Sequence, residues 1–188
     1  FPVPFDCSIV HSEKNKEIKV QDHFSFYGQL TDFKGYDVII DIFSNYTNSK
    51  LNIYPHVAVS SKSYQSKNIS IIEGYSWSNG LLDKAINSSK GVLIPSLWPT
   101  TCEYALFEAL LRKIPVILFN VGAHKDLFVN MHNAIVVDPI DKNSFAKGIQ
   151  ELDKNPDLRK SIGENGFKTL KALNNPIKLY EKLIEAYK

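Results

Sequence analysis

The sequence predicts an α/β fold, a three-layer α/β/α domain of Rossmann-like type with a mainly parallel sheet. Short apolar segments alternate with segments of helical periodicity along the chain, which is the pattern of repeated βαβ units. The runs GVLI (91–94) and PVILF (115–119) are apolar throughout. Strands that are buried on both faces of a parallel sheet have this continuous apolar pattern, whereas half-exposed strands alternate.

The first half of the chain alternates in this way. Its expected elements are a strand at 24–27 ending at Gly28, a polar loop at 28–35, a helix at 36–46, a strand at 51–59, a strand ending at Gly74, and a helix at 77–89. The helix at 36–46 is indicated by apolar residues at helical spacing. The segment 51–59 contains Pro55, which favours a sheet edge, a bulge or a break at that point.

The second half continues the alternation and then becomes helical. Its expected elements are a strand at 91–95, a helix at 101–113, a strand at 115–119, a turn with a short helix at 120–130, a strand at 133–138, and helices at 142–153, 156–173 and 176–187. Asn-Pro pairs at 155–156 and 175–176 separate the last three helices, because the residue before a proline is disfavoured in helical conformation.

The length sets the domain organisation, because 188 residues is the size of a single domain. We expect a connector at 1–22, a Rossmann-like domain at 23–175 and a terminal helix at 176–188. The proline-rich start, FPVPFD, and the lack of an initial Met indicate that an N-terminal domain is missing from this chain. The terminal helix would pack on its own domain or, alternatively, against that other domain.

Charge and cysteine content exclude several classes of partner. The formal net charge of +2 is too small to indicate nucleic acid or an anionic membrane. Cys7 and Cys102 lack metal or redox spacing, and His56 and His132 lack spacing partners, so we expect reduced thiols, a cytoplasmic location and no metal site. The sequence has no signal peptide and no apolar run of the roughly 20 residues that a membrane span needs.

Ligands of such sheets bind outside the carboxyl ends of the strands, against the loops and helix N-termini that follow. Four loops are therefore expected to form the site, at 28–35, 74–80, 95–103 and 120–126.

Two acids, Glu103 and Glu108, lie on the expected helix at 101–113. Thr100 and Glu103 have the spacing of a capping box, in which each side chain satisfies a free N–H of the first helical turn, and this explains Glu103 without a ligand. Glu108 projects back toward the strand ends, where its carboxylate could accept two hydroxyls of a ribose or sugar. The alternative for Glu108 is an ordinary exposed side chain.

Three further side chains in these loops each have two interpretations. His124 follows a glycine turn, where it would either meet a phosphate or be a surface polar residue. Tyr75 and Trp77 would either stack on a base or belong to the core.

The segment PSLWPTTCEYALFEALLRKIPVILFNVGAHKDLF (95–128), followed by NAIVVDPID, resembles the C-terminal domain of retaining GT-B glycosyltransferases of the group 1 type, also called family 4. The shared pattern runs from Pro-Ser through Glu-Ala and Pro-Val to a glycine turn, an apolar strand and Asp-Pro. Earlier in the chain, FYGQLTDFKGYDVIIDIF (26–43) is similar to the strand, loop and Lys-Gly helix start of that family. The resemblance covers about residues 24–170.

The resemblance implies a domain that binds a nucleoside diphosphate sugar, either UDP- or GDP-linked, without a metal or other cofactor. Lys34 matches the lysine that contacts the diphosphate and Glu108 the glutamate that holds the ribose, so we expect both to be catalytic. The other expected donor-binding residues are Gly28, Gln29, Ser96, Thr100, Thr101, Cys102, Glu103, Tyr104, Tyr75, Gly122 and His124.

The full enzyme would then be a retaining, hexosyltransferase-like enzyme of polysaccharide or glycolipid biosynthesis. Its missing N-terminal domain would bind the hydroxyl acceptor, and it would be cytoplasmic, with peripheral association at the cytoplasmic membrane face left open. We expect this chain alone to bind nucleotide weakly and to have no transferase activity.

Two positions depart from the family pattern. The first acid of the family motif is expected eight residues before Glu108, where this chain has Thr100. Gln29 stands where the family usually has arginine, so a neutral amide replaces half of the positive clamp. The alternative function is therefore a catalytically impaired GT-B-like scaffold or a partner-binding domain.

Overall fold

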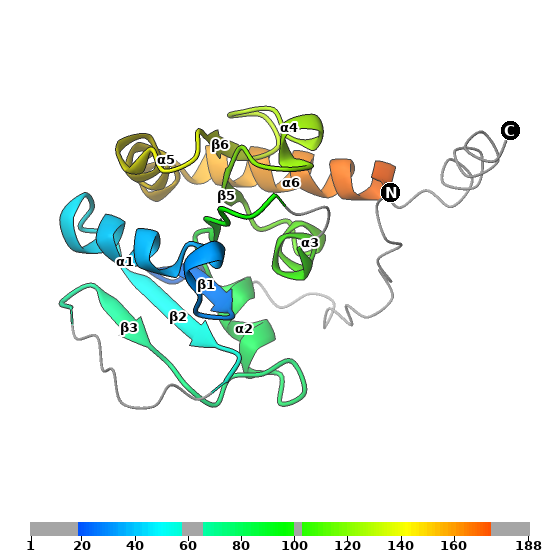
Figure 1. Ribbon diagram of the computed structural model, residues 1–188. Coiled ribbons are helices and arrows are strands. Elements are labelled where there is room, and N and C mark those ends of the chain that lie inside the picture. Colours follow the sequence, from blue (N-terminus) through cyan, green and yellow to red (C-terminus); the bar gives the residue numbers. More distant parts are fainter. Residues whose placement is uncertain (1–18, 58–65, 100–102, 174–188) are drawn as a thin grey trace, which may run out of the picture.

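Six parallel strands form one sheet in the order β3-β2-β1-β4-β5-β6 (Figure 1). They belong to a computed structural model that describes residues 19–57, 66–99 and 103–173. The strands are β1 (Phe24–Gly28), β2 (Leu51–Pro55), β3 (Ile69–Ile71), β4 (Val92–Ile94), β5 (Val116–Phe119) and β6 (Ile135–Val137). The predicted α/β fold with a parallel sheet is confirmed. Successive strands first build outward from β1 on one side and then, from β4 onward, on the other.

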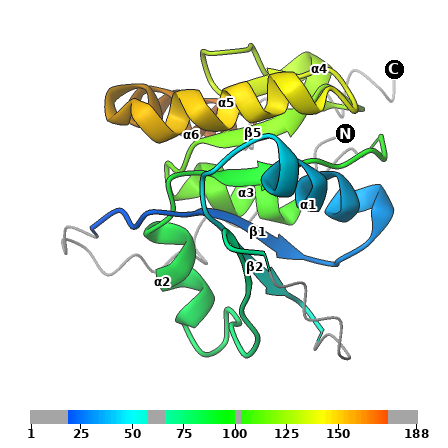
Figure 2. The ribbon, with the colours of Figure 1, turned by 90° about the vertical axis from the view of Figure 1, so that its left-hand side faces the viewer.

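Helices cover both faces of this sheet. They are the 3-10 helix η2 (Asp32–Lys34) and the α-helices α1 (Tyr36–Asn45), α2 (Leu81–Asn87), α3 (Tyr104–Leu111), α4 (His124–Leu127), α5 (Lys142–Lys154) and α6 (Pro156–Leu173). Two buried clusters show that α1 and α5 pack on one face, while α2, α3 and the last turns of α6 pack on the other (Figures 1 and 2). The result is the predicted three-layer arrangement.

The strand β5 explains why the apolar runs in the sequence do not alternate with polar residues. Ile117 and Phe119 belong to the cluster under α1 and α5, and Val116 and Leu118 belong to the cluster on the opposite face. All four side chains are fully buried. Successive side chains of a strand point to opposite faces, so a strand that is covered on both faces needs apolar residues at every position.

Pro55 is the last residue of β2, which lies inside the sheet between β1 and β3. The pairing of β2 with β3 ends at Ile53. The proline therefore lies beyond that ladder and removes no hydrogen bond from it, since proline has no N–H to donate. Pro55 still pairs with Gly28 of β1, so of the three predicted alternatives the structure shows a local edge, at the point where β2 has no β3 neighbour.

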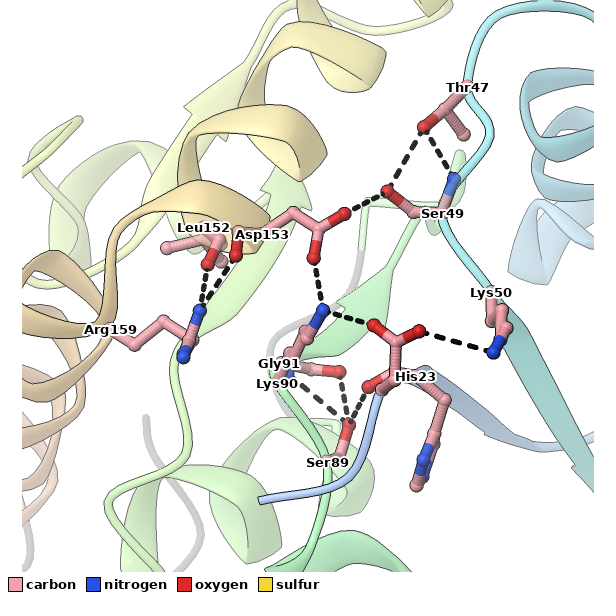
Figure 3. Close-up of polar contacts among 11 residues, drawn as sticks. His23, Thr47, Ser49, Lys50, Ser89, Lys90, Gly91, Leu152, Asp153 and Arg159 are labelled. Carbon is pink, nitrogen blue, oxygen red and sulfur yellow. Dashed lines mark hydrogen bonds and ion pairs between the residues drawn. The ribbon is translucent and has the colours of Figure 1, made fainter.

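An ionic network ties the amino edge of the sheet to α5 (Figure 3). Lys90, just before β4, bridges the carboxylates of Asp22 and Asp153. Lys50 also pairs with Asp22, at 3.2 Å, and the hydroxyl of Ser49 donates to Asp153 at 2.6 Å. Burial lowers the pKa of the Lys90 ammonium, but the two carboxylates outweigh it and hold that pKa above its ordinary value. Each carboxylate has a lysine partner, so the network is a structural connection.

The terminal helix expected at 176–188 lies outside the described residues, as does most of the connector at 1–22. Among the helices that the structure describes, none combines the length and the apolar composition that crossing a bilayer requires.

Candidate functional site

Two adjoining cavities open at the carboxyl edge of the sheet. The smaller one, of about 220 Å³, lies beyond the ends of β1 and β4. The larger one, of about 530 Å³, extends past the end of β2 toward α2. The two share the lining residues Tyr27, Gly28, Tyr104 and Ala105. In doubly wound sheets the crevice between the two strands where the chain order reverses is the usual ligand site, and here those strands are β1 and β4.

The loop after β1 packs directly against the end of β4. Gly35 has a φ of 73°, and a Cβ built on it would lie 2.0 Å from the carbonyl oxygen of Pro95. Only glycine allows both this left-handed conformation and this close approach. The contact brings the preceding residue, Lys34, to the wall of the smaller cavity, where Gln29 and Ser96 also lie.

Glu103 is the only acid among the described residues that line the smaller cavity, and its side chain is 4% exposed. Its Oε1 atom accepts from the Lys34 ammonium at 2.6 Å and from the hydroxyl of Ser96. The predicted capping box is wrong, because α3 begins at Tyr104, with Glu103 as the N-cap residue and no side-chain cap hydrogen bond. The charged Lys34 partner is a stronger competitor for the carboxylate than a backbone N–H.

His124 lies behind Glu103 and is 2% exposed, so its interpretation as a surface residue is wrong. Its Nδ1 atom lies 2.9 Å from the carbonyl oxygen of Phe119, and its Nε2 atom lies 4.0 Å from Oε2 of Glu103. That Oε2 atom is buried and has no hydrogen-bond partner within the described part of the chain. Neither His124 nor Gly122 is among the residues that line the two cavities.

Aromatic rings form the wall of the larger cavity. Tyr75 packs against Tyr54 in a tilted arrangement with ring centroids 5.2 Å apart, and Trp77 makes a T-shaped contact with Tyr27 at 5.9 Å. Trp77 is 37% exposed, so it is not a core residue. The guanidinium of Arg112 lies 4.5 Å from the centre of the Trp77 ring, which fixes that ring at the cavity by a cation–π contact.

Asn79 holds the loop that carries these rings. Its Oδ1 atom accepts from the backbone N–H groups of Ser76 and Leu81, at 3.1 and 3.0 Å. Its Nδ2 group donates to the carbonyl of Gly74 at 2.7 Å. Three hydrogen bonds from one amide pin the loop before α2, as asparagine commonly does in turns.

Glu108 of α3 is partly buried in the wall of the larger cavity. Burial raises the pKa of its carboxyl to about 7, although the neighbouring Tyr27 hydroxyl and the Arg112 charge act in the opposite direction. Burial also raises the pKa of Tyr27, with the Glu108 charge as a second cause. Near neutral pH this carboxyl is therefore poised to gain or lose a proton when a ligand arrives.

Residues from three of the four predicted loops, 28–35, 74–80 and 95–103, line the cavities, whereas the loop 120–126 reaches them only indirectly, through His124 behind Glu103. Gly28, Gln29, Lys34, Ser96, Glu103 and Tyr104 line the smaller cavity, while Tyr75 and Glu108 line the larger one. Thr100, Thr101 and Cys102 lie outside the described residues. Sequence reasoning missed Tyr27 and Arg112, because one looks like a strand residue and the other like a surface residue of a helix end. In the part of the chain that the structure describes, no three His, Cys, Asp or Glu side chains are grouped to hold a metal.

The sheet order and the paired cavities at its reversal point define a doubly wound α/β domain with a ligand cleft at the topological switch point. A sequence profile of the family described as "Glycosyl transferases group 1" matches residues 10–169. The chain belongs to this family, and the resemblance found in its motifs is confirmed. A search of curated proteins finds no match to the chain.

Solved glycosyltransferase structures share this fold. A mutant of S. aureus TarM, in complex with fondaparinux, α-GlcNAc-glycerol and UDP, has a TM-score of 0.74 at 18% identity, over 91% of this chain and 36% of TarM. The C-terminal domain of the group 1 family protein LpcC from Francisella tularensis has a TM-score of 0.70 at 17% identity, over 89% of this chain and 97% of that domain. Anabaena HepE in complex with UDP-glucose has a TM-score of 0.70 at 12% identity, over 89% of this chain and 48% of HepE. At these identities the likeness shows the fold, and this chain spans between about a third and half of TarM and HepE.

Proposed function

We propose that this chain is the donor-binding half of a retaining glycosyltransferase that uses a nucleoside diphosphate sugar. The observation that carries the proposal is the pair of adjoining cavities, one with Lys34 and the other with Glu108, at the switch point of the sheet. A cation and a carboxylate placed in this way match the diphosphate and the ribose of one extended ligand.

Each part of the ligand has a chemically suitable wall. The base would stack beside Tyr75 and Trp77, because their faces are large, flat and partly exposed in the larger cavity. The ribose would donate its two hydroxyls to the carboxylate of Glu108. The diphosphate would lie at Lys34 and at the start of α3, where the backbone N–H groups of a first helical turn and the helix dipole favour an anion.

The same groups would help the reaction. Negative charge grows on the departing diphosphate as the bond to the sugar breaks, and fixed positive charge at that point lowers the barrier. Lys34 and the start of α3 would supply it without a metal ion, so we expect turnover of the intact enzyme to persist in a chelator. The acceptor, which we propose to be a hydroxyl of a growing polysaccharide or a glycolipid, would bind on the N-terminal domain.

Two relatives in the same fold were solved with the expected kind of ligand, since HepE holds UDP-glucose and TarM holds UDP. We extend this to the present chain as UDP- or GDP-sugar binding. We further propose that the intact protein is cytoplasmic and meets its acceptor at the inner membrane face, and that residues 1–188 alone bind nucleotide weakly without turning it over.

A second candidate function is a catalytically impaired scaffold or partner-binding domain. Two observations favour it. Gln29 supplies no charge to the smaller cavity, and Lys34, the one cation among the described residues of its wall, is already paired with Glu103. A site with no net positive charge attracts a diphosphate less strongly than one with two free cations.

Isothermal titration calorimetry with UDP-glucose and a GDP-sugar separates the two candidates. Donor binding predicts measurable affinity for one of them and a loss of about tenfold in Glu108→Ala, since two charge-assisted hydrogen bonds disappear. Glu151→Ala is the matched control, because this exposed acid of α5 lines neither cavity. Absence of binding by the wild-type chain and by the full-length protein would leave the scaffold as the function.

A further inference from the structure

The hydrogen bond of His124 to Phe119 decides which ring nitrogen carries a proton. A carbonyl oxygen only accepts, so Nδ1, at 2.9 Å from the Phe119 oxygen, must be the donor. In neutral His124 the other nitrogen, Nε2, is then a bare acceptor. It faces Oε2 of Glu103 at 4.0 Å, which is also an acceptor. Two acceptors that face each other do not attract.

Burial makes this arrangement costly while the imidazole is neutral. The side chains of His124 and Glu103 are 3% and 4% exposed, and no described residue donates a hydrogen bond to Oε2. A buried carboxylate oxygen without a donor is unfavourable, whereas a satisfied one is not. A second proton on the imidazole removes the conflict, because Nε2–H then carries positive charge toward Oε2 and the two groups become an ion pair.

The protonation state of His124 therefore changes how much Glu103 neutralises Lys34. With neutral His124, the charges of Glu103 and Lys34 cancel. With the imidazolium, the same carboxylate lies between two cations, and the three side chains carry a net charge of +1. The ammonium of Lys34 is the positive member of this group that lines the smaller cavity.

We propose that His124 is a positioning residue for anion binding: its imidazolium forms an ion pair with the carboxylate of Glu103. The ammonium of Lys34 can then pair with the diphosphate of the ligand. This rests on the proposed function. The imidazolium of His124 supplies the second positive charge that Gln29 does not provide. It does so from behind the cavity wall, whereas Gln29 lies in that wall. Binding of the diphosphate then draws one proton onto His124.

The groups that face the His124 ring come from three parts of the fold. Phe119 of β5 offers its carbonyl, Phe128 follows α4 and meets the ring edge-on at 6.0 Å, and Glu103 at the start of α3 offers its carboxylate. Lys34 and Ser96 both donate to the other oxygen of that carboxylate, Oε1. Imidazole is the side chain type that ordinarily changes its charge near neutral pH.

The test compares two ligands over a pH range from about 5.5 to 8.5, on either side of the usual imidazole titration. UDP-glucose carries a diphosphate diester whose charge is constant over this range, whereas uridine lacks the diphosphate and reports on the larger cavity and Glu108 alone. We expect the ratio of UDP-glucose affinity to uridine affinity to fall about tenfold as pH rises in the wild type. In His124→Gln, where an uncharged amide replaces the imidazole, we expect a flat ratio.

Ring ¹⁵N chemical shifts of His124, assigned by their loss in His124→Gln, provide the second measurement. We expect the Nδ1–H tautomer in the free protein at high pH, and the imidazolium at the same pH once UDP-glucose is bound. A neutral ring in the complex, or an equal pH dependence of the ratio in both proteins, would overturn the proposal. Failure of UDP-glucose to bind the wild type at any pH would instead remove the proposed function, and this inference with it.

Discussion

The carboxylate of Glu103 organises the charges of the smaller cavity. It is buried at the start of α3. Its Oε1 atom accepts hydrogen bonds from the Lys34 ammonium and the Ser96 hydroxyl, and its Oε2 atom faces His124. A residue that holds a buried charge in place affects stability as well as binding, since removal of its partner leaves that charge unpaired.

Lys34→Met is expected to lower the free energy of unfolding by about 1–2 kcal/mol, because Glu103 keeps its buried charge and loses its cation. Glu103→Gln in the same chain should recover most of this loss, since a neutral amide needs no counter-charge. Urea unfolding of the two single variants and the double variant measures the coupling. Lys125→Met, an exposed lysine of α4, is the control. Additive effects of the two substitutions would contradict the role given to this ion pair.

Glu108→Gln is expected to raise the stability of the ligand-free protein more at pH 8 than at pH 5. The pKa of Glu108 is raised from 4.5 to about 7 in the folded state, so between these values the folded protein holds a proton that the unfolded chain has lost. The free energy of unfolding therefore falls as pH rises through this window. Each pKa unit is worth about 1.4 kcal/mol, and solvent screening of this partly exposed group reduces the total to about 1–2 kcal/mol. Thermal unfolding at the two pH values measures the difference, and an equal gain at both would contradict the assignment.

At the scale of elements, the loop between β1 and α1 positions the cation of the site. The loop ends in η2, and its geometry depends on the contact between Gly35 and Pro95 at the end of β4. This contact joins two strands that meet at the switch point, so the site and the packing of the sheet are coupled there.

Gly35→Ala is expected to destabilise the fold by more than about 2 kcal/mol, since a Cβ would meet a backbone oxygen at 2.0 Å in addition to the strain of φ 73°. Gly80→Ala is the matched control. Its φ is 69°, but its Cβ would have no neighbour within 4 Å, so we expect a loss of only about 1 kcal/mol. Chemical denaturation of both variants separates the backbone strain, which they share, from the close contact. Equal losses would show that the contact with Pro95 relaxes freely.

At the scale of the whole molecule, the two edges of the sheet have different roles. The carboxyl edge carries the cavities, and the amino edge carries the ionic network around Lys90 (Figure 3). Parallel strands place all their amino ends together, so one network reaches the segment before β1 and the end of α5 at once.

Lys90→Met is expected to lower the free energy of unfolding by about 1–3 kcal/mol, because it removes the cation that bridges Asp22 and Asp153. Nucleotide affinity should stay within about twofold of the wild type, since the network lies at the edge opposite the cavities and distant sites act independently. Urea unfolding at low and high salt, with calorimetry of UDP-glucose, measures both effects. A large loss of affinity in a protein that remains folded would show that the two edges are coupled.

Local patterns were sufficient to predict the order of the strands and helices that the structure describes, although α2 and α3 are shorter than predicted. The apolar runs before Pro95 and after Ile114 contain β4 and β5. The loop that carries Lys34 begins at Gly28 and ends at Gly35. Glu108 also lies at the cavity, as its place on the helix predicts. These features depend on spacing along the chain, which the sequence contains directly.

The role of Glu103 could not be predicted in the same way. Its spacing from Thr100 fits a helix cap, and the cap is wrong because Lys34, 69 positions away in the chain, takes the carboxylate. The burial of His124 and the contact of Tyr27 with Glu108 likewise join distant segments.

By itself the sequence determined the α/β class, the order of the elements, the family and the two charged residues expected at the ligand. The tertiary structure alone decided the charge state of the cleft: which cation is already paired, which acid has a raised pKa and which histidine lies behind the wall. The reason is physical. Periodicity and turn residues act over a few positions, whereas desolvation and ion pairing depend on which distant side chains fold against one another.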